Sequence, residues 1–133
     1  MANTSAKDIY NSFEATFSDK HEIPESLEFQ WLKMAIGKYN MEIAIDEPLV
    51  FDTALQMFAT ELDQYVVDTL GQMIRTYYSE RYDSKVNKIA SIVGKDISIN
   101  GQGNLQKYAK YELDHHSEKM NEMIENQKPV AMA

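Results

Sequence analysis

Residues 52–82 constrain the fold most, because they form the longest stretch without proline that keeps an unbroken helical repeat. Apolar residues recur there three or four positions apart, which places them on one stripe of an α-helix. A second apolar line widens this surface, so we expect the helix to be contacted from more than one side. Asp52 precedes the repeat and is expected to cap the helix. The stripe consists of Leu55, Phe58, Leu62, Val66, Leu70, Met73, Ile74 and Tyr77, and the second line of Met57, Tyr65, Val67 and Tyr78.

The composition is that of one folded domain covering residues 1–133. Hydrophobic residues make up 44% of the chain and charged residues 26%, which is typical of a soluble globular protein. We expect flexible tails only at residues 1–4 and 129–133. No apolar run is long enough to span a bilayer, and the N-terminus does not resemble a signal peptide. The sequence therefore predicts a protein of a cytosol-like solution that does not bind membranes.

The charge balance argues against nucleic acid as a ligand. The formal net charge is −8, and a field of this sign repels DNA and anionic membranes. The same field suits a surface that DNA passes without sticking. The chain has no cysteine, which excludes disulfides, thiol nucleophiles and cysteine-bound zinc.

Two shorter helices are expected before the central one. Ser5 and Asp8 have the spacing of a capping box at the start of the first. Pro24 stands where the first turn of the second tolerates proline. This second helix is apolar on two sides, and Met34 belongs to one of its stripes. Gly37 lies inside it, and such a glycine usually indicates close packing against another helix.

The C-terminal third is expected to contain a break, an arm and a last helix. Residues 83–84 read as a break or a surface turn, after which a short helix ends at Gly94. In residues 95–103, Ile97 and Ile99 alternate with polar residues before an Asn-Gly pair, which indicates a short strand or extended arm. Asn104 is expected to cap the last helix. The predicted fold class is all-α: a small helical bundle with one long central helix, a short extended arm near 95–103 and a flexible C-terminal tail.

The sequence contains one pattern that resembles a metal site. Glu112 and His115 have the Glu-x-x-His spacing of carboxylate-bridged di-iron sites in four-helix bundles. Such sites need a second motif of the same kind, and this chain has only three histidines and no second Glu-x-x-His. We therefore assign no metal ligand, and expect His115 to be solvated and His116 to lie near a buried edge.

Catalytic and cofactor motifs are also missing from the sequence. No Gly-x-Ser-x-Gly nucleophile elbow occurs, and the pair Gly101 and Gly103 lacks the pattern of a phosphate-binding loop. We assign no catalytic residue and no cofactor. The eight tyrosines and eight methionines instead suit surfaces that are buried against other proteins.

Several segments together carry a likeness to a known family. They are Trp-Leu-Lys-Met-Ala-Ile at 31–36 followed by Tyr39, the long helix after Phe51 and Asp52, Tyr-Tyr-Ser-Glu-Arg at 77–81, Gly-Lys-Asp-Ile-Ser-Ile-Asn-Gly at 94–101 before a helix rich in lysine and glutamate, and Gln-Lys-Pro at 127–129. In these segments the chain resembles the small helical head-tail connector proteins of tailed bacteriophages. These adaptor or head-completion proteins form a ring beneath the portal.

The resemblance implies a structural virion protein without enzymatic activity. Its copies would form an oligomeric ring in the phage neck, complete the head, and surround the channel through which the genomic DNA passes without sequence-specific binding. Expected partners are the portal protein, other neck or tail-completion proteins, and further copies of this chain. The expected location is the virion neck, with the host cytoplasm during assembly. The implied assembly contacts are Ile97 and Ile99 in the arm and Val130 and Met132 in the tail. Tyr77 and Tyr78 are expected contacts as well, because their rings combine an apolar body with a polar tip.

Two other hypotheses remain open from the sequence. One is a small helical bundle that binds a metal through Glu112, His115 and carboxylates of other helices. The other is a cytosolic protein that regulates a single partner.

Overall fold

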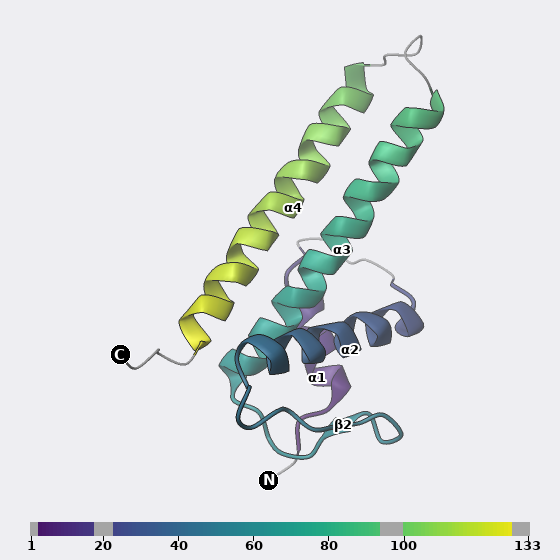
Figure 1. Cartoon of the computed structure of the whole chain (residues 1–133). Coiled ribbons are helices and arrows are strands. Elements are labelled where there is room, and N and C mark those ends of the chain that lie inside the picture. The colour runs from purple at the N-terminus through teal and green to yellow at the C-terminus, as the bar shows by residue number, and fades with distance from the viewer. Residues whose placement is uncertain (1–2, 18–22, 94–99, 129–133) are drawn as a thin grey trace.

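The computed structural model describes residues 3–17, 23–93 and 100–128, and within them the chain is mostly helical (Figure 1). The described residues form four helices that pack together and one very short β-hairpin. The expectation of a small helical bundle with one long central helix is thus confirmed. In chain order the elements are α1 (Ala6–Glu14), α2 (Glu25–Glu42), β1 (Phe51–Asp52), β2 (Met57–Phe58), α3 (Gln64–Val93) and α4 (Asn100–Gln127).

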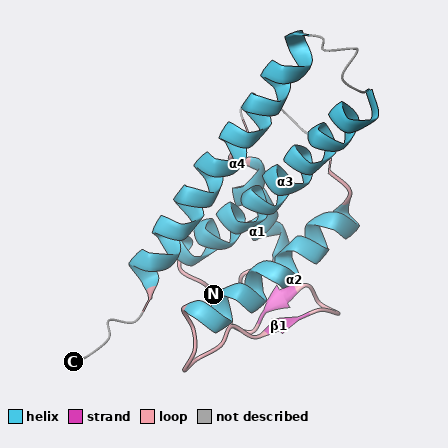
Figure 2. Cartoon of the chain, turned by 45° about the horizontal axis from the view of Figure 1, so that its top comes forward, coloured by secondary structure: helices cyan, strands magenta, loops and turns pink. Residues whose placement is uncertain are grey.

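Helices α3 and α4 form a long antiparallel pair, and the other elements gather around the first half of α3. Figure 1 and Figure 2 show α1, α2 and the hairpin at one end of this pair, while the far ends of α3 and α4 extend beyond them. Helix α3 is contacted by α1, α2 and α4. Every residue from 69 to 76 is buried, so this part of α3 is covered all round. The expectation that the central helix is contacted from more than one side is confirmed.

Helix α1 begins as the sequence predicts. The Ser5 hydroxyl accepts a hydrogen bond from the backbone N–H of Asp8, and the Asp8 carboxylate accepts one from the backbone N–H of Ser5. This capping box satisfies amides that the first helical turn leaves unpaired. Ile9 and Phe13 then enter the core.

The central helix begins at Gln64, so the prediction that it follows Asp52 directly was wrong. Residues 51–58 form an antiparallel hairpin in which Phe51 pairs with Phe58. The Asp52 carboxylate accepts hydrogen bonds from the backbone N–H groups of Ala54 and Leu55, but these close a turn and not a helix. Gln56 has a φ of 53°, which a right-handed helix does not allow. Phe58 is buried as expected, on a strand.

The hairpin is held by the N-terminus of the described chain. Thr4, which we placed in a flexible tail, is buried. It forms backbone hydrogen bonds with β2 and with the residues that follow it. Its carbonyl accepts from the N–H of Phe58, and its N–H donates to the carbonyl of Thr60. Its hydroxyl accepts from the N–H of Leu62. Thr4 thus satisfies backbone groups that a two-stranded hairpin leaves unpaired.

Two boundaries in the C-terminal third differ from the predictions. Helix α3 runs through residues 83–84 to Val93 without the predicted break, supported by a hydrogen bond from the Asn87 amide to the Asp83 carboxylate. Helix α4 begins at Asn100, so residues 100–103 are helical and Asn104 is not a cap. A helix satisfies its backbone internally, which an isolated arm cannot do. Gly94, Ile97, Ile99, Val130 and Met132 lie outside the described residues.

Helix α2 buries one broad face and exposes the opposite side. Trp31, Leu32 and Tyr39 lie in the core, whereas Met34, which belongs to one of the apolar stripes described from the sequence, is 53% exposed. Apart from the adjacent residues and the backbone of α2 itself, no heavy atom of the described residues lies within 4 Å of the position that a Cβ on Gly37 would occupy. The close contact predicted for this glycine is therefore absent from the described chain. No helix within these residues is apolar over a length that could cross a membrane.

The close helix contact occurs at Gly71 instead. A Cβ there would lie 2.7 Å from the Ser12 hydroxyl oxygen and 3.0 Å from the Phe13 backbone nitrogen. Glycine therefore allows α1 and α3 to approach each other closely.

We predict opposite effects for alanine at the two glycines. Gly71→Ala should lower the free energy of unfolding by about 1–3 kcal/mol, because the new methyl group meets the backbone of α1. Gly37→Ala, in open space, should raise it by up to about 1 kcal/mol through helix propensity. Urea denaturation followed by circular dichroism measures both. A Gly71→Ala variant as stable as the natural chain would contradict the close packing.

Candidate functional site

The contact between α3 and α4 contains a line of polar side chains, which we call the polar seam. On α3 it consists of Thr69, Gln72, Arg75, Thr76 and Ser79, all buried, and on α4 of Glu112, His116 and Gln127. The Gln127 amide nitrogen donates to the Thr69 hydroxyl at one end. Arg75 and Glu112 form an ion pair of 3.2 Å toward the other. Because buried polar groups need partners, the seam fixes how the two helices align.

His116 lies at the centre of the seam and has a defined neutral form. The side-chain nitrogen of Gln72 lies 3.2 Å from the His116 carbonyl oxygen, so it is a donor, and 3.0 Å from His116 Nδ1. Nδ1 must therefore accept, and the ring proton belongs on Nε2, which donates to Glu112 Oε2 at 3.2 Å. A second proton on the ring would face the Gln72 donor. The seam thus selects the neutral imidazole.

The electrostatics of the site act in the same direction. Burial and the neighbouring Arg75 guanidinium lower the pKa of His116 to about 4, while Glu112 opposes them. His115, the next residue, is exposed and stacks on the Tyr111 ring. The expected placement of the two histidines is confirmed.

Arg75 connects the seam to a group of aromatic rings. Its Nη1 donates to the Ser79 hydroxyl at 2.7 Å, and its guanidinium lies 4.2 Å from the Phe17 ring centroid and 5.2 Å from that of Tyr78. These contacts compensate part of the loss of hydration of a buried cation. The adjacent cavity of about 490 Å³ is lined by four tyrosines, Tyr78, Tyr82, Tyr108 and Tyr111.

The two tyrosines predicted as assembly contacts both pack against the protein's own core. The Tyr78 ring lies against Phe17 and Trp31, with centroids 4.9 and 6.3 Å away. Burial, with Glu80 and Glu42 nearby, raises the pKa of Tyr77 to about 12. Each is only partly buried, so their role in assembly stays a prediction.

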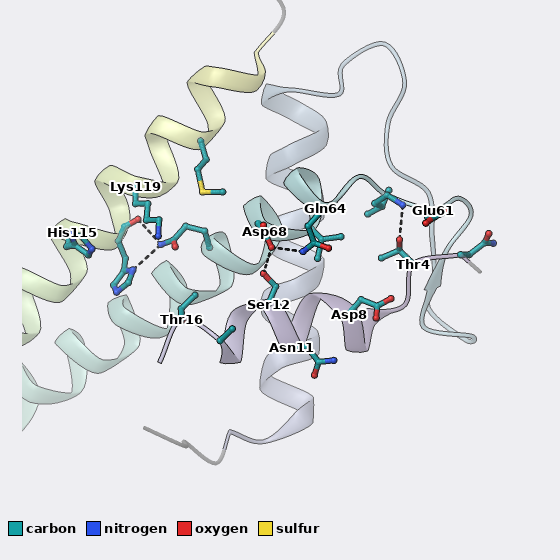
Figure 3. Close-up of a pocket in the computed structure, with 17 residues that line it drawn as sticks. Thr4, Asp8, Asn11, Ser12, Thr16, Glu61, Gln64, Asp68, His115 and Lys119 are labelled. Atoms are coloured by element: carbon teal, nitrogen blue, oxygen red, sulfur yellow. Dashed lines mark hydrogen bonds between the residues drawn. The ribbon is translucent and has the colours of Figure 1, made fainter. Parts of the chain in front are cut away.

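A polar groove of about 1060 Å³ lies between α1, the start of α3 and α4 (Figure 3). At its centre the Asp68 carboxylate accepts hydrogen bonds from the Ser12 hydroxyl at 3.0 Å and from the Gln64 amide at 2.8 Å. His115 and Lys119 line it from α4. The single proton of Ser12 is thus committed to a carboxylate that joins α1 to α3. This is a structural contact and not the hydroxyl–imidazole pair of a serine nucleophile.

The geometry of the Glu-x-x-His pattern does not favour a metal centre. Glu112 faces Arg75 and His116, whereas the His115 ring lies on Tyr111. Across residues 3–17, 23–93 and 100–128, no three histidine or carboxylate side chains converge as metal ligands do. Glu112 already has two hydrogen-bond donors on one oxygen.

The exposed side of α2 carries large apolar side chains without cover. Met34, Gly37 and Met41 are spaced three and four residues apart and share one helix face, which we call the α2 stripe. Met41 is 79% exposed, and Ile45, just past the helix, is also exposed. The segment that follows α2 is held against the helix, because the Asn40 side chain forms two hydrogen bonds with the backbone of Leu49.

Comparison with protein-family models, with curated proteins and with solved structures finds no match for this chain.

Several residues that matter here were not identified from the sequence, namely Gly71, Arg75, Gln72 and Glu28. The spacing of Gln72, Thr76 and Ser79 by four and three residues could have indicated a polar face on α3. A search for apolar periodicity alone does not detect this polar face.

The neutral imidazole predicts a defined pH dependence. The folded pKa of His116, about 4, lies below the ordinary value of 6.5, so the unfolded chain binds the proton more readily between these pH values. This group's contribution to stability is present above pH 6.5 and is lost as the pH falls to 4, by up to about 3 kcal/mol. Urea titrations at several pH values, compared between the natural chain and His116→Gln, should show this difference. His115→Gln is the matched control, and an equal difference for both variants would contradict the assignment.

Proposed function

We propose that this protein is a structural subunit of the neck of a tailed bacteriophage, where its copies form a ring beneath the portal. The α2 stripe carries the proposal, because it combines two highly exposed methionines with Gly37, which no other element of the described chain approaches closely. Methionine packs adaptably against protein partners, and glycine allows the backbone of a second element to come close. We assign this stripe to contact with a neighbouring copy in the ring.

Three further properties support the proposal. The polar contacts described above are engaged in holding helices together, which suits a structural role. The net charge of −8 suits a channel wall that does not retain DNA. The far ends of α3 and α4 extend past the helical body and offer a surface for neighbours above or below (Figure 1). The resemblance of the sequence to connector proteins is the reason for proposing the phage neck as the assembly.

The direct test is electron microscopy of the protein mixed with the portal encoded beside it, with its mass in solution measured on the same preparation. The proposal expects an added ring of density under the portal. A chain that stays apart from the portal at high concentration would overturn it.

A charged residue on the α2 stripe should separate assembly from folding. Met41→Glu should leave the free energy of unfolding within about 0.5 kcal/mol, because the side chain is exposed, and should reduce the fraction of portals that carry the ring. Asn121→Glu on α4 adds the same charge on another exposed surface and serves as control. Equal ring formation by Met41→Glu and the natural chain would remove the stripe from the interface.

A further inference from the structure

A further pocket, lined by three glutamates among other residues, lies between α1, the start of α2 and the turn of the hairpin. Its volume is about 570 Å³. Tyr10 and Glu14 are four residues apart on α1, and Glu25 and Glu28 are three apart on α2, so each pair shares a helix face. Three carboxylates therefore border one hollow, together with Tyr10 and the Phe29 ring, and we call it the acidic pocket.

Glu28 distinguishes this pocket from an ordinary cluster of surface charges. The residue is only 4% exposed, and its Oε2 atom has no hydrogen-bond partner among the residues that the structure describes. A buried carboxylate oxygen without a partner is unfavourable, and such groups in native proteins are usually satisfied. Two other buried polar atoms of the described residues also lack a hydrogen-bond partner, but each belongs to a group with a charged partner: Glu42 Oε2 lies 3.0 Å from Lys38 Nζ, and the Arg75 guanidinium, whose Nε is unpaired, contacts Glu112. The unpaired acceptor in the acidic pocket indicates that a bound ligand supplies the hydrogen-bond donor.

The surroundings of Glu28 favour a positively charged donor. Burial, with Glu14 and Glu25 nearby, raises the pKa of Glu28 to about 7, and burial with Glu28 and Glu25 nearby raises the pKa of Tyr10 to about 12. Burial is the largest cause of both pKa shifts, and the neighbouring carboxylates add to it. Lys7 also lines the pocket, but among the described residues no salt bridge joins it to these glutamates.

The spacing of the carboxylates selects the kind of cation. No three acidic or histidine side chains in the described part of the chain lie close enough together to hold a metal ion. A guanidinium group is larger, carries five N–H donors in one plane, and stacks on aromatic rings. Carboxylates on two helices with Tyr10 and Phe29 beside them match that shape.

We propose that the acidic pocket binds the arginine side chain of a partner protein, with the guanidinium group donating to Glu28 and to the carboxylates of Glu14 and Glu25. An arginine within a polypeptide fits better than the free amino acid, whose own carboxylate the three glutamates would repel. This inference goes beyond the neck proposal and does not depend on it.

The test is a titration of the isotope-labelled full chain with the peptide acetyl-Gly-Arg-Gly-amide at pH 7.5, followed by NMR of the backbone amides. We expect shifts at Tyr10, Glu14 and Glu28 that saturate, and none of this size with the same peptide containing citrulline, which is uncharged but of similar shape. Free arginine should bind more weakly than the peptide. Absence of shifts in the pocket, or equal shifts with citrulline, would overturn the proposal.

Substitution of Glu28 separates binding from folding. Glu28→Gln should weaken peptide binding at least tenfold while the melting temperature at pH 7.5 is unchanged or higher. The natural carboxyl group has a folded pKa above its ordinary value, so its contribution to stability declines as the pH rises from about 4.5 to 7, and glutamine removes this decline. Glu118→Gln, exposed on α4, is the control for the lost charge.

If Glu28→Gln does not fold, Glu25→Gln at the exposed rim takes its place, with an expected partial loss of binding. Binding unchanged in the folded variant would overturn the proposal. Because the titration uses the isolated chain, its failure leaves the portal experiment unaffected, and a negative portal experiment leaves the titration unaffected.

Discussion

The hydrogen bonds of the polar seam are the interaction on which the arrangement of α3 and α4 depends. Apolar side chains along two long helices allow several alignments of similar energy, since one leucine or methionine replaces another with little loss. Gln72 does not allow this freedom, because its amide nitrogen must meet both the His116 carbonyl and His116 Nδ1. Sliding α4 by one turn would leave Gln72, Arg75 and His116 buried without partners. Other alignments of α3 and α4 are unfavourable because they lose these hydrogen bonds.

Helix α3 can support this seam because its other sides are closed by shorter elements. Gly71 brings α1 close, and Phe13 on α1 contacts Phe17, Trp31 and Tyr78 at ring centroid distances of 5.3–6.4 Å. The hairpin and Thr4 close the end of the bundle. Water is thereby kept from residues 69–76 of α3, which strengthens the electrostatic contacts of Arg75 and His116. The aromatic cluster and the polar seam support each other.

The sequence predicted the helices where one local signal dominates and failed where two signals compete. Ser5 and Asp8 satisfy the first amides of α1 whatever follows, so that start was predictable. Asp52 can cap a helix or close a turn with the same two hydrogen bonds, and the backbone of Gln56 decides between them. At Gly37 the pattern predicts a contact that the single chain does not contain. The pairing of Arg75 with Glu112 could not be predicted, because the two residues are 37 positions apart in sequence and meet only through the alignment of α3 and α4.

Two buried titratable groups illustrate how structural and binding roles can be told apart. His116 and Glu28 are both almost fully buried, and burial is the largest cause of the shifted pKa in each. His116 has a partner for each ring nitrogen, so its neutral form is complete within the chain and serves the fold. Glu28 has an oxygen without a donor and two further carboxylates nearby, so neither of its forms is complete. Protonation of Glu28 removes its charge but gives Oε2 no hydrogen-bond partner. A guanidinium group neutralises the charge and also donates a hydrogen bond. The unmet hydrogen bond, and not the shifted pKa, is therefore what marks the acidic pocket as a site for a ligand.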